Sequence, residues 1–319
     1  MKHRALAVGA ALAVSAALTA APALAAAPSG VAGAVGAAVP ASRQAAPVAG
    51  AVYVGHRAGG VKVLVHRGGW TSHTAGGAGF TGQFAVAPDG LRVAWIDDGG
   101  RLHVSAGGTD KVVARNAAAG APCMTPAWTA DGKRLAYPVG GGSGAATTVA
   151  VVGADGTGRS VGGRTSGPCH LTWSADGRTL AGYAGDTAGV HLLDTRRRVS
   201  VRVPGVKLAN HVESLSPDAR RVVVNAIGPD APGGDGSWPM SFTPSVYDTR
   251  TGAKIAIPVK GRLLGARYLR DGRLAVRVRG NTGGSAAGTL VILSPSGKEL
   301  QRLPEPAKVR ALGLVGVLE

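Results

Sequence analysis

Four polar residues have the chemistry of a binding or acid–base site and stand in matching sequence contexts: His170, His211, Glu213 and Arg267. Histidine accepts or donates a proton near neutral pH, and a neighbouring carboxylate can orient its ring. His170 and His211 stand 6 and 7 residues before an Asp of a repeated motif. We therefore expect the four side chains at one end of equivalent strands, where they bind a ligand or provide the ordinary polar lining of a wet channel.

The only two cysteines, Cys123 and Cys169, also occupy matching positions, in "PCMTPAWTADG" and "PCHLTWSADG". In an exported protein this placement predicts a disulfide rather than two free thiols. Closing a loop of this length would stabilise the fold by about 4 kcal/mol. His170 follows Cys169 directly, but two Cys and one His are too few for a zinc site, so we expect no metal and no cofactor.

Five acidic residues recur in equivalent positions, four of them directly before a glycine, and each is followed by a basic and then an apolar run. They are Asp89, Asp131, Asp176, Asp218 and Asp271, at spacings of 42, 45, 42 and 53 residues. No catalytic or metal site needs five such distant copies, so we interpret each Asp as a structural turn residue that bonds nearby backbone, while Gly takes the left-handed conformation. After Asp218 the Gly is replaced by Ala219, for which that conformation costs about 1 kcal/mol, and this turn is expected to differ.

The repeat predicts an all-β fold, a six-bladed β-propeller with four antiparallel strands per blade. Residues 51–319 divide into six units of about 45 residues, whereas seven units would each be shorter than any observed spacing. Five units contain the Asp turn. The sixth is split, with its last three strands within 51–76 and its first strand in "KVRALGLVGVLE" at the other end of the sequence. The terminal strands would thus close the first blade and remove free sheet edges.

These units resemble the TolB-type six-bladed propeller repeat, in which a strand, a Ser-Pro/Ala-Asp-Gly turn and an Arg-led strand recur. The likeness covers about 51–319, and "VVGADGTGRSVGG" is similar to the family's second turn. The resemblance implies the fold. The small domain that precedes the propeller in TolB is missing here, so the family's periplasmic lipoprotein partner is not implied.

The first 25 residues have the pattern of a secretory signal peptide, with a basic start, an apolar core and "ALA" at 23–25 as the cleavage site. Residues 26–50 have a low-complexity composition typical of a flexible linker. We therefore expect a secreted, extracellular monomer without a transmembrane anchor, whose domain is 51–319. Its composition resembles that of actinobacterial secreted proteins.

The net charge of +17 arises from 35 Lys and Arg against 18 Asp and Glu. Such an excess attracts polyanions, for example an anionic cell-wall polymer. The charge is scattered, and its densest run is only "RRR" at 196–198, so an ordinary basic surface also explains it. We expect no nucleic-acid partner.

The 53-residue spacing indicates an insertion of about 11 residues in the loop 228–242, between the second and third strands of its blade. Trp238 and Met240 would give it an adaptable contact surface, unless Trp238 packs down locally. In propeller topology this loop shares a face with the fourth-to-first connections, and so with both cysteines and both histidines.

The sequence favours a non-catalytic binding or scaffold protein that recognises an unknown protein or envelope ligand. The Gly-x-Ser-x-Gly and His-Glu-x-x-His motifs are absent. The enzymatic alternative is a lyase or hydrolase that uses His170, His211 and Glu213 at the channel mouth. It fails if the two histidines lie more than about 10 Å apart with no acidic neighbour, because acid–base partners must come near hydrogen-bonding distance. A polyanion binder is the third alternative.

Overall fold

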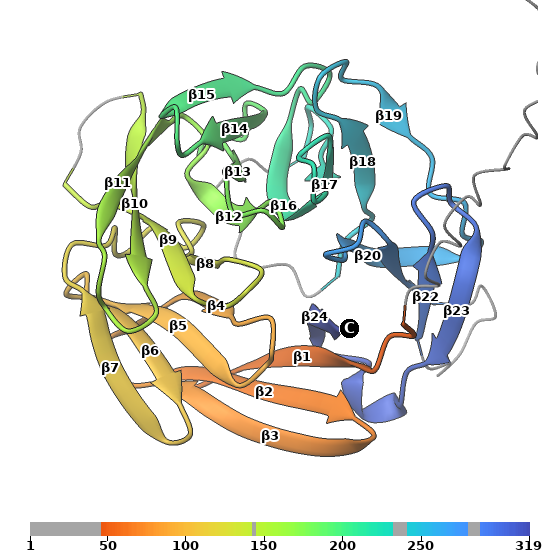
Figure 1. The fold of residues 1–319 in the computed structure, drawn as a ribbon, viewed down its shortest axis with the longest axis horizontal. Coiled ribbons are helices and arrows are strands. Elements are labelled where there is room, and N and C mark those ends of the chain that lie inside the picture. The colour runs from red at the N-terminus through yellow and green to blue at the C-terminus, as the bar shows by residue number, and fades with distance from the viewer. Residues whose placement is uncertain (1–45, 142–144, 232–240, 280–287) are drawn as a thin grey trace, which may run out of the picture. The chain divides into compact units, whose positions relative to one another are not determined.

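Six four-stranded antiparallel sheets form the blades of a β-propeller, as the repeat predicted. The computed structural model describes residues 46–319, except 142–144, 232–240 and 280–287. The predicted signal peptide, the linker up to residue 45, and Trp238 and Met240 therefore lie outside the described residues. Figure 1 shows the blades around a central axis, with the first strand of each blade innermost.

The first three blades are described from the axis outward. Blade 1 consists of β24 (Gly313–Leu318), β1 (Gly50–Arg57), β2 (Gly60–Arg67) and β3 (Gly69–Gly76). Blade 2 consists of β4 (Phe80–Val86), β5 (Arg92–Asp97), β6 (Leu102–Ala106) and β7 (Thr109–Ala114). Blade 3 consists of β8 (Ala127–Trp128), β9 (Arg134–Pro138), β10 (Thr147–Gly153) and β11 (Ser160–Thr165).

The other three blades follow in the same order. Blade 4 consists of β12 (Cys169–Trp173), β13 (Thr179–Tyr183), β14 (Val190–Asp194) and β15 (Val199–Arg202). Blade 5 consists of β16 (Ala209–Leu215), β17 (Arg221–Ala226), β18 (Ser245–Asp248) and β19 (Lys254–Ile255). Blade 6 consists of β20 (Arg262–Tyr268), β21 (Leu274–Arg279), β22 (Thr289–Leu293) and β23 (Glu299–Pro304).

Strands from the two ends of the described chain close the ring in blade 1, where β24 pairs with β1 between Gly50↔Leu318 and Val54↔Gly313 (Figure 1). The structured part begins slightly before the predicted boundary at 51, because β1 starts at Gly50 and Val48 is already buried. A short 3-10 helix, η1 (Ala307–Val309), precedes β24.

A buried ion pair holds η1 against blade 6. Arg277 Nε lies 2.8 Å from Glu305 Oε2, and Arg277 Nη2 donates to the carbonyl of Val309 at 2.9 Å. Both charged residues are almost fully buried. Removing either partner would leave the other charge uncompensated in the interior, which is strongly destabilising.

The repeated Asp residues lie in the turns between the first and second strands. In each of the five turns the Asp Oδ1 accepts a hydrogen bond from the backbone N–H two residues on, at 2.9 to 3.1 Å. The following residue has a positive φ in every copy. The expectation that the Asp218 turn differs is wrong: Ala219 adopts φ +58° and its N–H bonds to the Ser216 carbonyl like its counterparts. The local hydrogen bonds outweigh the strain of a left-handed Ala.

Where an Arg stands three residues after the Asp, it joins neighbouring blades. Arg92 of blade 2 lies over the ring of Trp128 in blade 3, with 4.9 Å between its Cζ and the ring centroid. Its Nη1 donates to the carbonyl of Gly132 at 2.9 Å, in the turn of that next blade. The basic residue of the motif therefore contributes to packing between blades through a cation–π contact and a hydrogen bond.

Candidate functional site

The innermost strands of all six blades surround an axial cavity of about 160 Å³. Its lining includes all four polar residues singled out in the sequence, His170, His211, Glu213 and Arg267. They come from three consecutive blades, because β12, β16 and β20 run side by side around the axis (Figure 1). Towards the Asp-turn end, Arg270 of blade 6 reaches across the ring and donates to the carbonyl of Ala130 in blade 3.

The four side chains form one continuous chain of polar contacts. Arg267 Nη2 donates to Glu213 Oε1, and His211 Nε2 lies 2.8 Å from Glu213 Oε2. On its other side, His211 Nδ1 shares a hydrogen bond with His170 Nδ1. The histidines and the glutamate are buried, while the Arg267 side chain retains partial exposure. The two rings therefore meet the geometric requirement of the enzymatic alternative.

The contact between the two rings limits their protonation. One Nδ1 must donate and the other accept, so the two rings cannot both be imidazolium ions. His211 is either neutral with its proton on Nε2, or charged and donating to both neighbours. In either state hydrogen bonds connect Glu213 to His170, which gives a path along which a proton can be shared.

The surroundings shift the pKa values at both ends of this chain. Burial, together with the neighbouring His211, holds the pKa of His170 well below its ordinary value of 6.5, so this ring is neutral at pH 7. Burial alone would raise the pKa of Glu213, but the charge of Arg267 and the hydrogen bonds from His211 and Arg267 outweigh it and lower that pKa. The carboxylate is therefore ionised and compensated.

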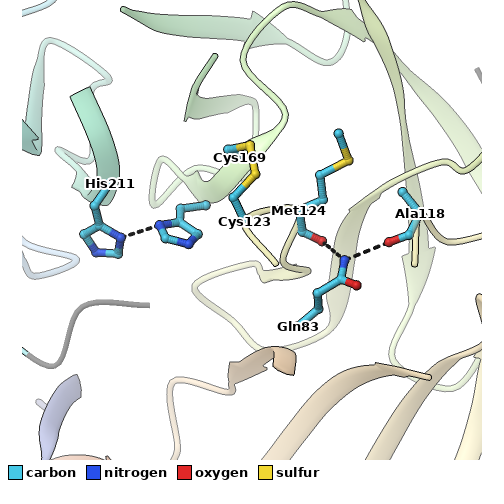
Figure 2. Close-up of a disulfide and its surroundings, with 7 residues drawn as sticks. Gln83, Ala118, Cys123, Met124, Cys169 and His211 are labelled. Carbon is cyan, nitrogen blue, oxygen red and sulfur yellow. Dashed lines mark hydrogen bonds between the residues drawn. A yellow bond between two sulfur atoms is a disulfide. The ribbon is translucent and has the colours of Figure 1, made fainter. Parts of the chain in front are cut away.

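His170 is held in an unusual backbone conformation beside the disulfide. Its φ is +46°, in the left-handed region that costs a non-glycine residue on the order of 1 kcal/mol. Its N–H donates to the carbonyl of Cys123 at 2.7 Å. The predicted Cys123–Cys169 disulfide is present and connects the blade 2–3 loop to β12 (Figure 2). Residues whose neighbours hold them in a strained backbone conformation are found most often at functional sites. His170 is therefore a strong candidate for a functional role.

Gln83 on β4 is a buried polar residue beside the site that the sequence reasoning missed. It is fully buried, its Nε2 donates to the carbonyls of Ala118 and Met124 at 2.7 and 2.8 Å, and its Oε1 accepts from Gly120 N–H at 3.0 Å. Figure 2 shows the amide between these carbonyls, beside the disulfide. Gln83 and the disulfide thus anchor the loop 115–126 near the axis. Its signal was one amide in the apolar strand "FTGQFAV".

The described end of the insertion reaches the same site. The insertion lies between β17 and β18 as predicted, and the ring of Phe242 packs edge-on against His211 with centroids 5.0 Å apart. Trp238 and Met240 fall outside the described residues, so their contact role stays a prediction. Phe242 excludes water from one side of His211, and the sequence reasoning did not single it out.

Neither a metal site nor a membrane-spanning helix occurs in the part of the chain that the structure describes. Within those ranges, no group of three or more His, Cys, Asp or Glu side chains is arranged to hold a metal ion. No helix there is both long and apolar enough to cross a bilayer.

Comparisons with known proteins identify the fold. No family model and no curated protein matches this sequence. TolB from Acinetobacter baumannii aligns with a TM-score of 0.50 and 14% identity, over 84% of this chain and 67% of that chain. A chain of the nidogen/laminin complex aligns with a TM-score of 0.50 and 11% identity, over 84% and 97%.

A prolyl endopeptidase aligns less well, with a TM-score of 0.43 and 17% identity over 80% of this chain and 43% of that chain. The protein is thus a six-bladed β-propeller. Among solved structures its fold is similar to that of TolB. At these identities the likeness shows the fold alone.

Proposed function

We propose that this protein is an exported, non-catalytic binding propeller that recognises a protein or envelope ligand through its axial cavity. The observation that carries the proposal is the buried Arg267–Glu213–His211–His170 chain facing that cavity. Arg267 Nε is buried and has no hydrogen-bond partner among the described residues, so it offers a donor to an oxygen-bearing group of a ligand.

Two further observations support this proposal. The Cys123–Cys169 disulfide is consistent with an oxidising, extracytoplasmic location. A propeller of similar fold occurs in a complex of nidogen with laminin, which is a precedent for protein binding by this architecture.

The test is affinity capture from the envelope fraction of the source culture with the chain that follows the predicted signal peptide. Arg267→Gln should abolish capture of a species that the wild type retains. Arg197→Gln is the matched control, because this side chain is 83% exposed on the outer part of blade 4. Identical capture by wild type and Arg267→Gln, with both proteins folded, would exclude the axial cavity as the binding site.

A second candidate is an acid–base enzyme, either a hydrolase or a lyase. The observation in its favour is the carboxylate–His211–His170 chain, since a base oriented by a carboxylate is the usual arrangement for proton abstraction. Its test is turnover of a panel of activated esters and glycosides by wild type and His211→Asn. Rates equal to buffer, or rates that survive His211→Asn, would eliminate the hydrolase form of this candidate.

The third candidate is binding of an anionic cell-wall polymer, which the net charge of +17 favours. Attraction through many scattered cations should weaken steeply as salt rises, because the bound polymer releases counterions. Titration of inorganic polyphosphate at low and physiological salt measures this dependence. Binding that is absent, or insensitive to salt, would rule the candidate out.

A further inference from the structure

The boundary between blades 5 and 6 departs from the arginine–tryptophan packing that fills the boundaries between blades 2 and 3 and between blades 3 and 4. Between blades 3 and 4, Arg134 lies over Trp173 with 5.8 Å between Cζ and the ring centroid, and donates to the carbonyl of Gly177. This repeats the Arg92–Trp128 contact of blades 2 and 3. In both places a cation, an indole ring and a turn carbonyl occupy the gap between blades.

The corresponding residues of blades 5 and 6 are Arg221 and Tyr268, three residues after and before their Asp turns. Arg221 Nη1 donates instead to Pro295 in the outer turn of blade 6, at 3.3 Å. Tyrosine is smaller than tryptophan, and the guanidinium has moved outward from the turn glycine. A groove of about 280 Å³ lies at this boundary.

The short outer strand of blade 5 explains why the groove is open. β19 has only two residues, so the sheet does not extend over the neighbouring blade as the longer fourth strands do. The walls come from both blades, and polar groups of Arg221, Ser294 and Ser296 stand beside apolar side chains. The apolar side chains include Val246, Ile255, Leu274 and Leu293. Val246, Leu274 and Leu293 belong to the buried core of blades 5 and 6, which gives the groove a rigid floor.

One end of this apolar groove contains an unneutralised cation. Among the described residues Arg221 forms no ion pair, whereas its counterpart Arg92 lies 2.9 Å from Asp89. The equivalent acid, Asp218, accepts hydrogen bonds through Oδ1 from Ser216 Oγ and Arg220 N–H. Apart from its bonds to the Pro295 carbonyl and the Tyr268 hydroxyl, the half-buried guanidinium retains N–H donors for an anion, in a setting of reduced solvation where such bonds are strong.

We propose that this groove binds a small monocarboxylate with an apolar ring or branched chain. The carboxylate accepts hydrogen bonds from Arg221, and the apolar part contacts Val246, Leu274 and Leu293. The size is suitable, because an apolar cavity of about 150 Å³ holds a benzene ring and this groove is larger. The site is independent of the proposed function in the axial cavity, although Tyr268 lines both spaces and lies between them.

The experiment compares 3-phenylpropionate with its neutral amide, 3-phenylpropanamide, by calorimetric or NMR titration of the intact protein. We expect saturable binding of the carboxylate and at least tenfold weaker binding of the amide. Arg221→Gln should weaken carboxylate binding by at least tenfold, and Arg221→Lys by less. Arg134→Gln changes the same repeat position at a filled boundary and should leave the affinity unchanged. Arg267→Gln in the axial cavity should also leave it unchanged.

Three outcomes would overturn the proposal. The first is equal affinity for the acid and the amide, and the second is an equal loss of affinity in Arg221→Gln and Arg134→Gln. The third is the absence of saturable binding up to about 10 mM, because a small ligand of this kind is expected to bind with a dissociation constant in the millimolar range. Thermal unfolding of each variant establishes that it is folded. If Arg221→Gln fails to fold, the wild-type preference for acid over amide and the Arg221→Lys result still decide the question.

Discussion

Replacing Ala219 by glycine should stabilise the propeller, although it removes a side-chain methyl. Ala219 has φ +58° at the position where the other four turns have glycine. A left-handed conformation costs a non-glycine residue roughly 1–2 kcal/mol, and glycine avoids this cost. Glycine also makes the unfolded chain more flexible, which offsets about 0.5–1 kcal/mol of the gain in stability. The methyl is partly buried, so its removal takes back a few tenths of a kcal/mol. The net expectation is a gain of about 0.5 kcal/mol, since Ala219 contributes only its backbone N–H and carbonyl to the hydrogen bonds of the turn.

The reverse substitution, glycine to alanine at the equivalent position of blade 6, provides the control. Gly272 has φ +88°, and a Cβ there would meet only Pro295 Cγ at 3.7 Å, an ordinary contact. Gly272→Ala therefore tests the backbone strain without a clash and should lower stability by roughly 1 kcal/mol. For a domain of this size each kcal/mol moves the melting temperature by about 2–4 °C. Thermal unfolding of both variants measures the pair, and a loss of stability in Ala219→Gly would refute the reasoning.

Three further predictions concern the residues around the site and the ring closure. Replacing both Cys123 and Cys169 by serine should lower the free energy of unfolding by about 4 kcal/mol, measured by denaturant titration; an unchanged midpoint would show that the loop gains nothing from the crosslink. Stability should fall as pH drops below 6.5, because the depressed pKa of His170 means that the unfolded chain takes up a proton that the folded chain does not. His73 and His191, whose pKa values are also lowered by burial, contribute in the same direction, so His170→Asn should reduce this pH dependence without abolishing it. Below the ordinary pKa of Glu213 a further loss should follow as its lowered pKa is approached. Glu305→Ala should cost about 3–5 kcal/mol by leaving Arg277 buried without its partner, whereas Arg302→Ala, which removes an exposed ion pair with Glu299, should change the melting temperature little.

The fold was predictable because a propeller repeats the same local chemistry in each blade. Each Asp turn specifies its own hairpin, and five copies at a blade-length spacing define the ring even though 14% identity to TolB is weak evidence by itself. The Ala219 turn shows the limit of propensity reasoning. There the expected cost was real, but the surrounding hydrogen bonds were sufficient to impose the conformation.

The site was predictable only where it followed the repeat. His170 and His211 were singled out because they occupy related slots, and the structure places them in contact. Phe242 reaches His211 through the path of a long loop, and Gln83 is bonded to another such loop, and a repeat pattern carries no information about loop paths. The groove at blades 5 and 6 depends on the length of one outer strand and on a single tyrosine in place of tryptophan, so it becomes visible only when blade boundaries are compared in three dimensions.

The pairing of β24 with β1 links the formation of the axial cavity to closure of the ring. The paired residues Gly50 and Leu318 are 268 positions apart, and closing a loop of this length costs about 5 kcal/mol of chain entropy. β24 also contributes Val315, Gly316 and Val317 to the cavity wall. If β24 is released from the ring, the axial cavity therefore loses one of its walls. Any ligand that occupies the axis binds only the closed state, so its binding stabilises the closed ring against the release of this strand.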